Sequence, residues 1–418
     1  MSAPTRSGRL ASRPRALPRS VRTAIPASEP ASTAVLDAAR RDGPVFRDAL
    51  AAATGLSHAT ANRQVSRLLE AGLLRERPDL IPVGAVGRPR VPVEVEPDRF
   101  GVLGLHIGLR TATLAVGDLR GRVLGAQDVP TPDGSPAEVV GTLTRRLRGF
   151  GARWPERAML RLGVVVGGQL SSDRDRLRHP RLGWDAEPVA RIVDRIADPD
   201  VVLVPQVEAM AAAETVLARR EAVGRTLYVY AHEAVGAVLT SDGDGPTPPG
   251  GPGTISHLPV GGDVRCHCGA TGCLEASTGD AVVAAAAHRA GIVDEPSINK
   301  VIAAAERGDR AAHELLLRRA RLLGRGVALA RDVLNPDRVV LIGQAFTGYR
   351  PALAQVSAEF AASSALEPMS LRVSSLGAGV QALAACTVAL RAVYANPLAA
   401  VRKAQLRRPP LDRTQRPA

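Results

Sequence analysis

Three of the four cysteines in the chain lie within eight positions, in the stretch RCHCGATGCLE from Arg265 to Glu275. A disulfide framework is typical of a small secreted domain whose cysteines are spread along the chain, whereas this chain has 418 residues. Cys266, Cys268 and Cys273 instead have the spacing of metal ligands, and the two glycines between them would let the backbone wrap around an ion. The stretch therefore predicts a metal site.

A tetrahedral zinc site needs a fourth ligand, and two histidines compete for that place. His267 lies between two of the cysteines, where its ring would be awkwardly directed, whereas His257 lies at a reachable distance upstream. Neighbouring free thiols are the alternative, and the density of ligands disfavours it. The remaining cysteine is expected to be a small buried core residue. The predicted ligands of a structural zinc ion are His257, Cys266, Cys268 and Cys273.

The net positive charge of the chain is concentrated at its two ends. The formal net charge is +13, and residues 1–30 hold six arginines against one acid, without apolar periodicity, which predicts a disordered basic arm. Such a start is also typical of an organellar transit peptide. Residues 397–418 are basic as well, and we expect a disordered tail there. No stretch approaches the roughly 20 apolar residues that span a bilayer, which argues against a membrane protein.

Residues 31–97 predict a winged helix-turn-helix. A first helix ends at Gly43-Pro44, a second short helix follows, and Gly55 makes a tight turn before a third helix that Ser57 is placed to cap. The next segment, LIPVGAVGRPRVPVEV, alternates apolar residues around a Gly/Pro-rich tip, as a two-stranded wing does. This order of elements is that of a DNA-binding domain.

Polar side chains on the third helix could reach base edges and phosphates in a major groove. The alternative is a helical packing module whose charged face is only solvated. Arginines on the rigid wing loop suit a narrow minor groove and favour DNA binding. Because one module reads few base pairs, we expect a homodimer or homotetramer on double-stranded operator DNA. The predicted DNA contacts are Ser57, His58, Thr60, Asn62, Arg63, Arg67, Arg88 and Arg90.

Beyond the winged helix-turn-helix the pattern changes to α/β. Three antiparallel strands are expected between Phe100 and Val129, followed by an amphipathic helix and buried strands, and the same order restarts at TLYVYAHEAVGAVLTSDG. Two similar α/β lobes indicate a duplicated fold with a cleft between them. We place lobe 1 at residues 98–205, with 376–396 returning to it, and lobe 2, with the zinc loop, at 206–375.

The chain resembles the ROK family, which groups bacterial repressors and sugar kinases on the actin-like ATPase fold. The most specific match is the stretch from His257 to Glu275, and LNP at Leu334–Pro336 is a second one. The resemblance runs from about Thr33 to Asn396. It implies the same four zinc ligands, and the winged helix-turn-helix with its GRP wing is similar to the repressor branch of the family.

The resemblance also separates kinase from regulator. Family kinases hold ATP phosphate on a turn reading Asp-x-Gly-Gly-Thr, which aligns with His106–Arg110, and on a turn reading Gly-Thr-Gly-x-Gly, which aligns with His232–Gly236. Their catalytic base belongs to an Asn-Asp pair, and Gln206-Val207 stands in its place. Valine cannot accept a proton, so we predict no kinase activity and no catalytic residue.

The resemblance implies a sugar effector, and this chain has only half of the residues that bind the sugar in the family. Gln206, His257 and Glu275 are the candidate effector contacts, whereas Val207 and Thr254 replace carboxylates that would make the strongest hydrogen bonds. The sequence therefore predicts a cytoplasmic transcriptional regulator, a repressor, whose catalytically inactive ROK domain dimerises and senses a sugar or sugar derivative. The rival hypotheses are a sugar kinase with a fused DNA-binding domain and a ligand-independent DNA-binding protein.

Overall fold

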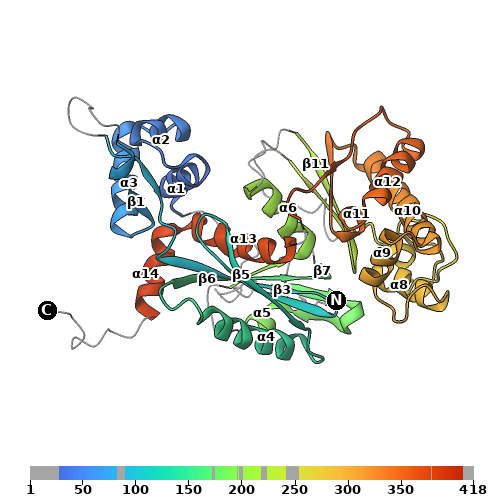
Figure 1. Cartoon of the computed structure of the whole chain (residues 1–418). Helices are drawn as coiled ribbons and strands as arrows, with labels where there is room; N and C mark the ends of the chain where they lie inside the picture. Colours follow the sequence, from blue (N-terminus) through green and yellow to red (C-terminus); the bar gives the residue numbers. More distant parts are fainter. Residues whose placement is uncertain are drawn as a thin grey trace, which may run out of the picture.

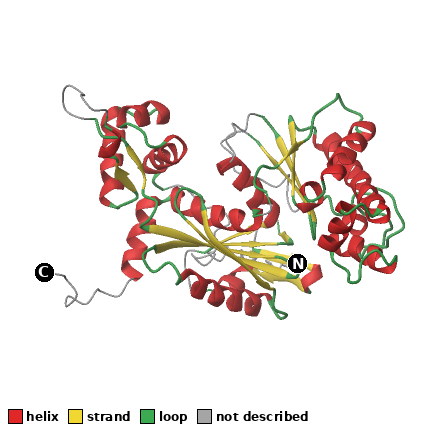
Figure 2. Ribbon diagram, in the orientation of Figure 1, coloured by secondary structure: helices red, strands yellow, loops and turns green. Residues whose placement is uncertain are grey.

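An N-terminal domain and two α/β lobes follow one another along the chain (Figures 1 and 2). The structure is a computed structural model, and it describes residues 28–81, 90–171, 175–194, 196, 201–217, 224–241, 254–377 and 379–407. Among the described residues, no single helix is both long and apolar enough to cross a membrane. One pair of helices that is bent by 100°, Val380–Ala395 and Pro397–Leu406, passes the same test of length and composition.

Three short helices and a two-stranded antiparallel sheet form the N-terminal domain. Gly55 has φ +66°, a left-handed conformation that ends the second helix and allows the tight turn before the third. The first strand of the wing was expected in the LIPV segment, but it lies upstream, because Pro78–Leu80 form a 3-10 turn. The tip of the predicted wing, residues 82–89, lies outside the described residues. The elements are α1 (Pro30–Asp42), α2 (Arg47–Thr54), α3 (His58–Glu70), β1 (Leu74–Glu76) and β2 (Val93–Val95).

Lobe 1 contains a five-stranded sheet in the order β10-β6-β3-β4-β5. The three strands expected after the N-terminal domain are confirmed as the antiparallel β3, β4 and β5, while β6 and β10 run parallel to β3. Helices α4 and α13 cover opposite faces of the sheet (Figure 1). The strands are β3 (Phe100–Ile107), β4 (Thr111–Gly117), β5 (Val123–Pro130), β6 (Ala158–Val166) and β10 (Val202–Pro205), and the helices are α4 (Pro136–Gly151) and α13 (Val380–Ala395).

A smaller three-stranded sheet and a short helix complete lobe 1: β7 (Gln169–Leu170), β8 (Arg176–His179), β9 (Trp184–Pro188) and α5 (Val189–Asp194). Helix α13 approaches the main sheet closely. A Cβ atom on Gly104 of β3 would lie 2.7 Å from the backbone nitrogen of Cys386, and one on Gly163 of β6 would lie 2.7 Å from the Ala385 carbonyl oxygen. Cys386 itself is buried, as the sequence predicts.

Lobe 2 contains a four-stranded sheet in the order β12-β11-β13-β14, with its helices packed beside it. The strands are β11 (Thr226–Ala231), β12 (Val235–Thr240), β13 (Arg338–Ile342) and β14 (Arg372–Val373). The helices are α7 (Leu274–Thr278), α8 (Asp280–Arg289), α9 (Ile298–Glu306), α10 (Arg310–Leu334), α11 (Gln344–Thr347) and α12 (Arg350–Ser363). Helix α6 (Gln206–Leu217) contacts strands of both sheets and therefore lies where the lobes meet.

The expectation of a disordered tail from residue 397 was wrong for residues 397–407, which form α14 (Pro397–Arg407). Leu398 and Val401 are buried in a core that also includes residues of α1, α3 and α13. The arm expected at residues 1–30 is likewise ordered at its end, since Glu29 accepts a hydrogen bond from the Leu398 backbone at 2.9 Å and pairs with Arg402. Burial of a few apolar side chains outweighs the basic composition that suggested disorder.

The N-terminal domain is joined to lobe 1 by more than the chain. Thr33 donates to the Tyr394 carbonyl oxygen of α13 at 2.8 Å. Arg40 of α1 donates to the Val216 carbonyl oxygen of α6 at 3.0 Å, and its guanidinium lies 5.9 Å from the centre of the Tyr394 ring. Together with the shared core, these contacts fix the orientation of the N-terminal domain relative to lobe 1 and α6.

Candidate functional site

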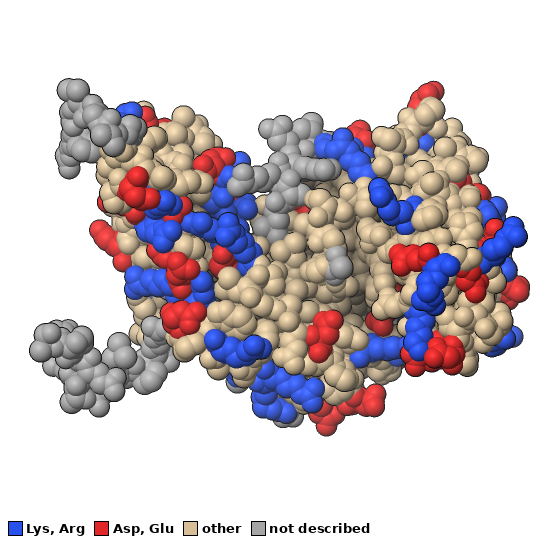
Figure 3. Space-filling model, viewed as in Figure 1, with Lys and Arg blue, Asp and Glu red and all other residues tan. Residues whose placement is uncertain are grey.

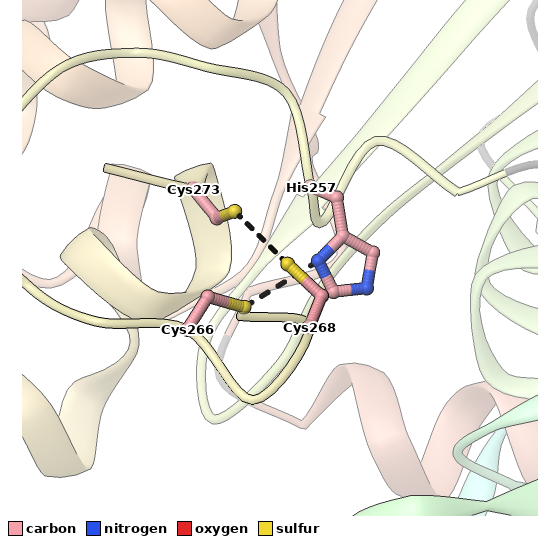
Figure 4. A group of neighbouring side chains, drawn as sticks. All are labelled: His257, Cys266, Cys268 and Cys273. Carbon is pink, nitrogen blue, oxygen red and sulfur yellow. Dashed lines mark hydrogen bonds between the residues drawn. The ribbon is translucent and has the colours of Figure 1, made fainter. Parts of the chain in front are cut away.

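The four predicted metal ligands come together in lobe 2 (Figure 4). Their donor atoms all lie within 4.8 Å of one another, with 3.5 Å between Cys266 Sγ and His257 Nδ1 and 3.6 Å between Cys268 Sγ and Cys273 Sγ. Zn–S bonds of about 2.3 Å and Zn–N bonds of about 2.0–2.1 Å at tetrahedral angles place the donor atoms about 3.5–3.8 Å apart. These four side chains are therefore close enough together to hold a metal ion.

The loop that holds the three cysteines depends on its glycines. Gly269 has φ +92° and Gly272 has φ +78°, both in the left-handed region. A Cβ on Gly272 would also lie 3.0 Å from the main chain of Gly261. The turn is closed by a hydrogen bond of 2.8 Å from the Cys266 N–H to the Ala270 carbonyl oxygen. Local backbone geometry thus brings ligands that are close in sequence onto one point.

The competition between the two histidines favours His257. The His267 Nδ1 atom lies 3.7 Å from Cys266 Sγ, and its ring packs edge-on against His257 with 5.0 Å between ring centres. The group of donor atoms that lie mutually within 4.8 Å contains His257, and His267 is not a member. His267 therefore borders the site beside the ligand ring.

The thiols of the site suit a bound cation. Hydrogen bonding from the backbone of Ala270 lowers the pKa of Cys268, whereas burial raises the pKa of Cys273 to about 12. A buried thiolate is costly without a positive partner, and a metal ion supplies one. Three thiols and one imidazole are a donor set that zinc prefers.

Strand ends of lobe 1 form one half of a polar site between the lobes. His106 lies at the end of β3, Gln206 directly follows β10, and Gly167 directly follows β6. A Cβ on Gly167 would lie 2.8 Å from His179 Nε2 and 3.6 Å from Gln206 Oε1, so these groups are close neighbours. The carboxyl ends of parallel strands are the usual ligand-binding edge of an α/β sheet.

Both histidines of this half are neutral at physiological pH. Burial lowers the pKa of His106 to about 4 and that of His179 to about 4. Gln206 interacts with the His106 ring, yet among the described residues neither ring nitrogen has a hydrogen-bond partner of normal geometry. The His106 side chain therefore brings no charge to this half of the site.

The second half comes from lobe 2. The Tyr230 ring stacks on His232 at 6.5 Å between ring centres, and burial raises the pKa of Tyr230, so its hydroxyl stays protonated. His232 Nδ1 lies 3.5 Å from Asp280 Oδ2, and Asp280 pairs with the buried Arg319. We call the region formed by these residues and the lobe 1 strand ends the interlobe site. The surface is recessed between the lobes in Figure 3.

The candidate effector contacts are divided between the two lobes. Glu275 accepts hydrogen bonds from the Val235 backbone at 3.0 Å and from Ser256 at 3.3 Å, next to His257. Gln206, the first residue of α6, lies beside His106 of lobe 1. Sequence reasoning missed Arg181, whose guanidinium lies 3.8 Å from Glu275 Oε1. No motif marks this arginine, because only the docking of the lobes brings it to Glu275.

The turn that follows β3 contacts the turn that follows β11 directly. The Leu109 N–H donates to Glu233 Oε2 at 3.2 Å. In addition, a Cβ on Gly236 would lie 2.7 Å from Val207 Cγ2, so Val207 packs against the start of β12.

Helix α3 presents a polar face of the predicted kind. Ser57 accepts a hydrogen bond from the Thr60 N–H at 3.3 Å, which confirms the N-cap. Ala61, Val65 and Leu68 are fully buried on the inner side of the helix, so the polar side faces away from the core. Thr60 is half-buried there, and the exposed residues are Ser57, His58, Asn62, Arg63 and Arg67.

The wing residues are only partly described. Arg90 is exposed and pairs with Asp48 of α2 at 3.0 Å, whereas Arg88 lies outside the described residues. Lys and Arg side chains gather over the lower part of the N-terminal domain, where it meets lobe 1 (Figure 3).

The chain is similar to a known protein family and to named transcriptional regulators. Residues 102–391 match the model of the ROK family. The chain is 43% identical over 390 residues to the Mycobacterium tuberculosis protein named transcriptional regulator Rv0485, covering 90% of this chain and 88% of the relative. It is 24% identical over 319 residues to the Escherichia coli DNA-binding transcriptional dual regulator NagC, covering 72% of this chain and 77% of the relative.

Two solved structures show the same fold. One is a ROK family transcriptional regulator described as a homologue of the E. coli MLC protein, with a TM-score of 0.69, 21% identity, and coverage of 89% of this chain and 98% of that chain. The other is a Streptomyces griseus ROK glucokinase, with a TM-score of 0.60, 18% identity, and coverage of 69% of this chain and 99% of that chain. The regulator matches more of this chain than the kinase does, and the predicted ROK-type two-lobed fold is confirmed.

Proposed function

The chain belongs to the ROK family and is a DNA-binding transcriptional regulator, and on this premise we propose that it is a repressor whose helix α3 reads the operator. The carrying observation is the 43% identity to the M. tuberculosis regulator over 90% of the chain. The remaining tenth is shorter than the N-terminal domain, so the similarity extends into the part that would contact DNA. We propose that the protein acts in the cytoplasm.

The role of α3 is tested in two steps. Genomic DNA sites that the protein binds are captured, and the affinity of the protein for the recovered sequence is then measured by titration. Arg63→Ala should weaken binding to that sequence by about 1–3 kcal/mol if the arginine makes a bidentate base contact, and much less on random DNA. Arg318→Ala, an exposed arginine on α10, is the matched control and should leave both affinities unchanged. Equal losses for Arg63→Ala on specific and random DNA would show that α3 does not read the sequence.

The wing supplies the second proposed contact. Arg88 and Arg90 would enter the minor groove beside the helix, where narrow AT-rich sequences attract arginine. Arg88→Ala should therefore weaken binding most on operators with an AT-rich flank, measured by titration on operators that differ only in that flank. A uniform loss on all flanks would assign Arg88 to phosphate contact alone.

The metal of the four-ligand site is proposed to be zinc with a structural role. Three cysteines and a histidine leave no open position for a substrate, and a closed site of this kind stabilises the fold. The ion would hold the loop that leads into α7, where Glu275 lies. Cys268→Ser should lose the metal, measured by elemental analysis of the purified protein, and should lower the melting temperature. Full metal content in Cys268→Ser would contradict the assignment.

The ROK domain is proposed to lack kinase activity. Val207 stands where family kinases have their catalytic carboxylate, and the Glu233 carboxylate lies at the turn that would receive phosphate. Incubation with ATP and a panel of hexoses should release no sugar-dependent ADP. Hexose phosphorylation that disappears on substitution of an interlobe residue would overturn this part of the proposal and favour the kinase with a fused DNA-binding domain.

The effector is proposed to be a sugar or sugar derivative held by Gln206, His257 and Glu275. A thermal-shift screen of sugars should find a stabilising ligand whose effect is lost in Glu275→Gln. An unchanged melting temperature across the screen would favour a ligand-independent DNA-binding protein. The same preparations, weighed by light scattering, test the proposed homodimer or homotetramer, and a monomer at operator-binding concentrations would contradict it.

A further inference from the structure

Two turns from different lobes meet at the interlobe site. The first, Gly108–Arg110, follows β3 of lobe 1, and the second, His232–Ala234, follows β11 of lobe 2. The Glu233 side chain crosses between them, because its Oε2 atom accepts a hydrogen bond from the Leu109 N–H at 3.2 Å. A Cβ on Gly108 would lie 3.4 Å from the same oxygen. The carboxylate therefore lies in van der Waals reach of this position, and the contact that excludes a side chain here is with the Thr111 carbonyl oxygen, at 2.6 Å.

Arg181 makes a second link to the same lobe 2 turn. It lies in the 3-10 turn Pro180–Leu182 between β8 and β9 of lobe 1. Its Nη1 atom donates to the Glu233 carbonyl oxygen at 2.6 Å and lies 3.8 Å from Glu275 Oε1. The arginine side chain is 31% exposed and that of Glu275 is 17% exposed. The bond from Arg181 to the Glu233 carbonyl oxygen is exposed to solvent, and its donor is charged, which makes it stronger than a neutral hydrogen bond.

The two links hold one residue, Glu233, through its side chain and through its main chain. The side chain of Glu233 is bound by the main chain of lobe 1, and its main chain is bound by a side chain of lobe 1. Neither bond involves a ligand, a metal or the polypeptide connection between the lobes. Moving lobe 2 away from lobe 1 would break both bonds together, because His232–Ala234 form one tight turn, closed by a 3.1 Å hydrogen bond from the His232 N–H to the Ala234 carbonyl oxygen.

We propose that Glu233 and Arg181 form a latch that holds the two lobes closed in the ligand-free protein. In this role the Glu233 carboxylate supplies, from within the chain, a negative charge that draws the two turns together. The same Arg181 Nη1 atom lies 3.8 Å from Glu275 Oε1, so the latch borders that side chain. Lobe closure is therefore a property of this chain alone and does not wait for a bound small molecule.

Hydrogen–deuterium exchange of the full chain, without DNA and without added ligand, tests the latch. Glu233→Ala and Arg181→Ala each remove one link, and amide exchange at residues 106–110 and 230–236 should rise about tenfold, the change that corresponds to one charge-assisted hydrogen bond. Glu233→Gln keeps an acceptor oxygen and should show a smaller rise. Arg178→Ala is the matched control, because this exposed β8 arginine pairs with Asp185 inside lobe 1.

Small-angle scattering of the same proteins gives an independent readout of lobe opening. The radius of gyration should increase in Glu233→Ala and Arg181→Ala and stay at the wild-type value in Arg178→Ala. Wild-type exchange at both turns in Glu233→Ala and in Arg181→Ala would overturn the latch. A rise in exchange throughout the chain would mean that the alanine variants have lost their fold. In that case Glu233→Gln is compared with the wild type. Wild-type exchange at both turns in Glu233→Gln refutes the latch, and a rise confined to the two turns supports it. Because no DNA or effector is present, failure here leaves the proposed regulator function standing, and failure of operator binding leaves the latch standing.

Discussion

Acid should destabilise this protein through His106, which is 4% exposed at the end of β3. Burial lowers the pKa of His106 from its ordinary 6.5 to about 4. Between these two pH values the unfolded chain binds a proton that the folded protein does not. The stabilising contribution is therefore complete above pH 6.5 and is lost as the pH falls toward 4. A difference of about 2.5 pKa units, at about 1.36 kcal/mol each, limits the total loss to about 3 kcal/mol.

The assay is urea unfolding, followed by circular dichroism, at a series of pH values from 7.5 to 5. At pH 5 the linkage relation gives about 2 kcal/mol of the loss. The free energy of unfolding should thus fall by about 2 kcal/mol more in the wild type than in His106→Gln, which cannot take up this proton. His288→Gln, a substitution of an exposed histidine on α8, should follow the wild type.

Acid also protonates carboxylates and metal-binding thiols, but these effects are common to all three proteins and cancel in the comparison. His179, whose pKa burial also lowers to about 4, leaves some acid sensitivity in His106→Gln. If His106→Gln loses as much stability as the wild type between pH 7.5 and 5, then His106 is not a buried neutral imidazole, and the description of the interlobe site is wrong at that position.

Three further predictions concern the metal ligand, the contact of α13 with the sheet, and the packing of α14. His257→Ala should lose the bound metal while His267→Ala keeps it, measured by elemental analysis, and the reverse pattern would show that the other ring is the ligand. Gly104→Ala should destabilise the protein by about 1–3 kcal/mol, because the added methyl group meets the main chain of α13. Gly149→Ala in α4, where nothing lies within 4 Å of the added carbon, should be neutral or stabilising in the same urea titration. Leu398→Ala should lower the free energy of unfolding by about 2–5 kcal/mol if α14 is part of the core. An unchanged unfolding midpoint would show that residues 397–407 do not pack on the core.

The features that the sequence determined are those whose partners are near in the chain. The three cysteines lie within eight positions, and two left-handed glycines suffice to fold them onto one point. The Ser57 cap bonds to a residue three positions away, and the turn before α3 needs only the positive φ of Gly55. Apolar runs bounded by Gly-containing turns identified the strands of the α/β lobes in the same way, and β3 is buried at all eight of its positions.

The features that only the tertiary structure decided join residues far apart in the chain. The bond between Leu109 and Glu233 spans 124 positions, and the Arg181 contact with the same glutamate spans 52. Composition suggested a tail where α14 forms, because a basic and proline-containing segment reveals nothing of the apolar surface on α1 and α13 that covers Leu398. The spacing of residues and the period of apolar residues indicate only the structure that a segment can form locally. Which lobe surface each side chain meets is set by the docking of whole elements, and that is a property of the packed chain.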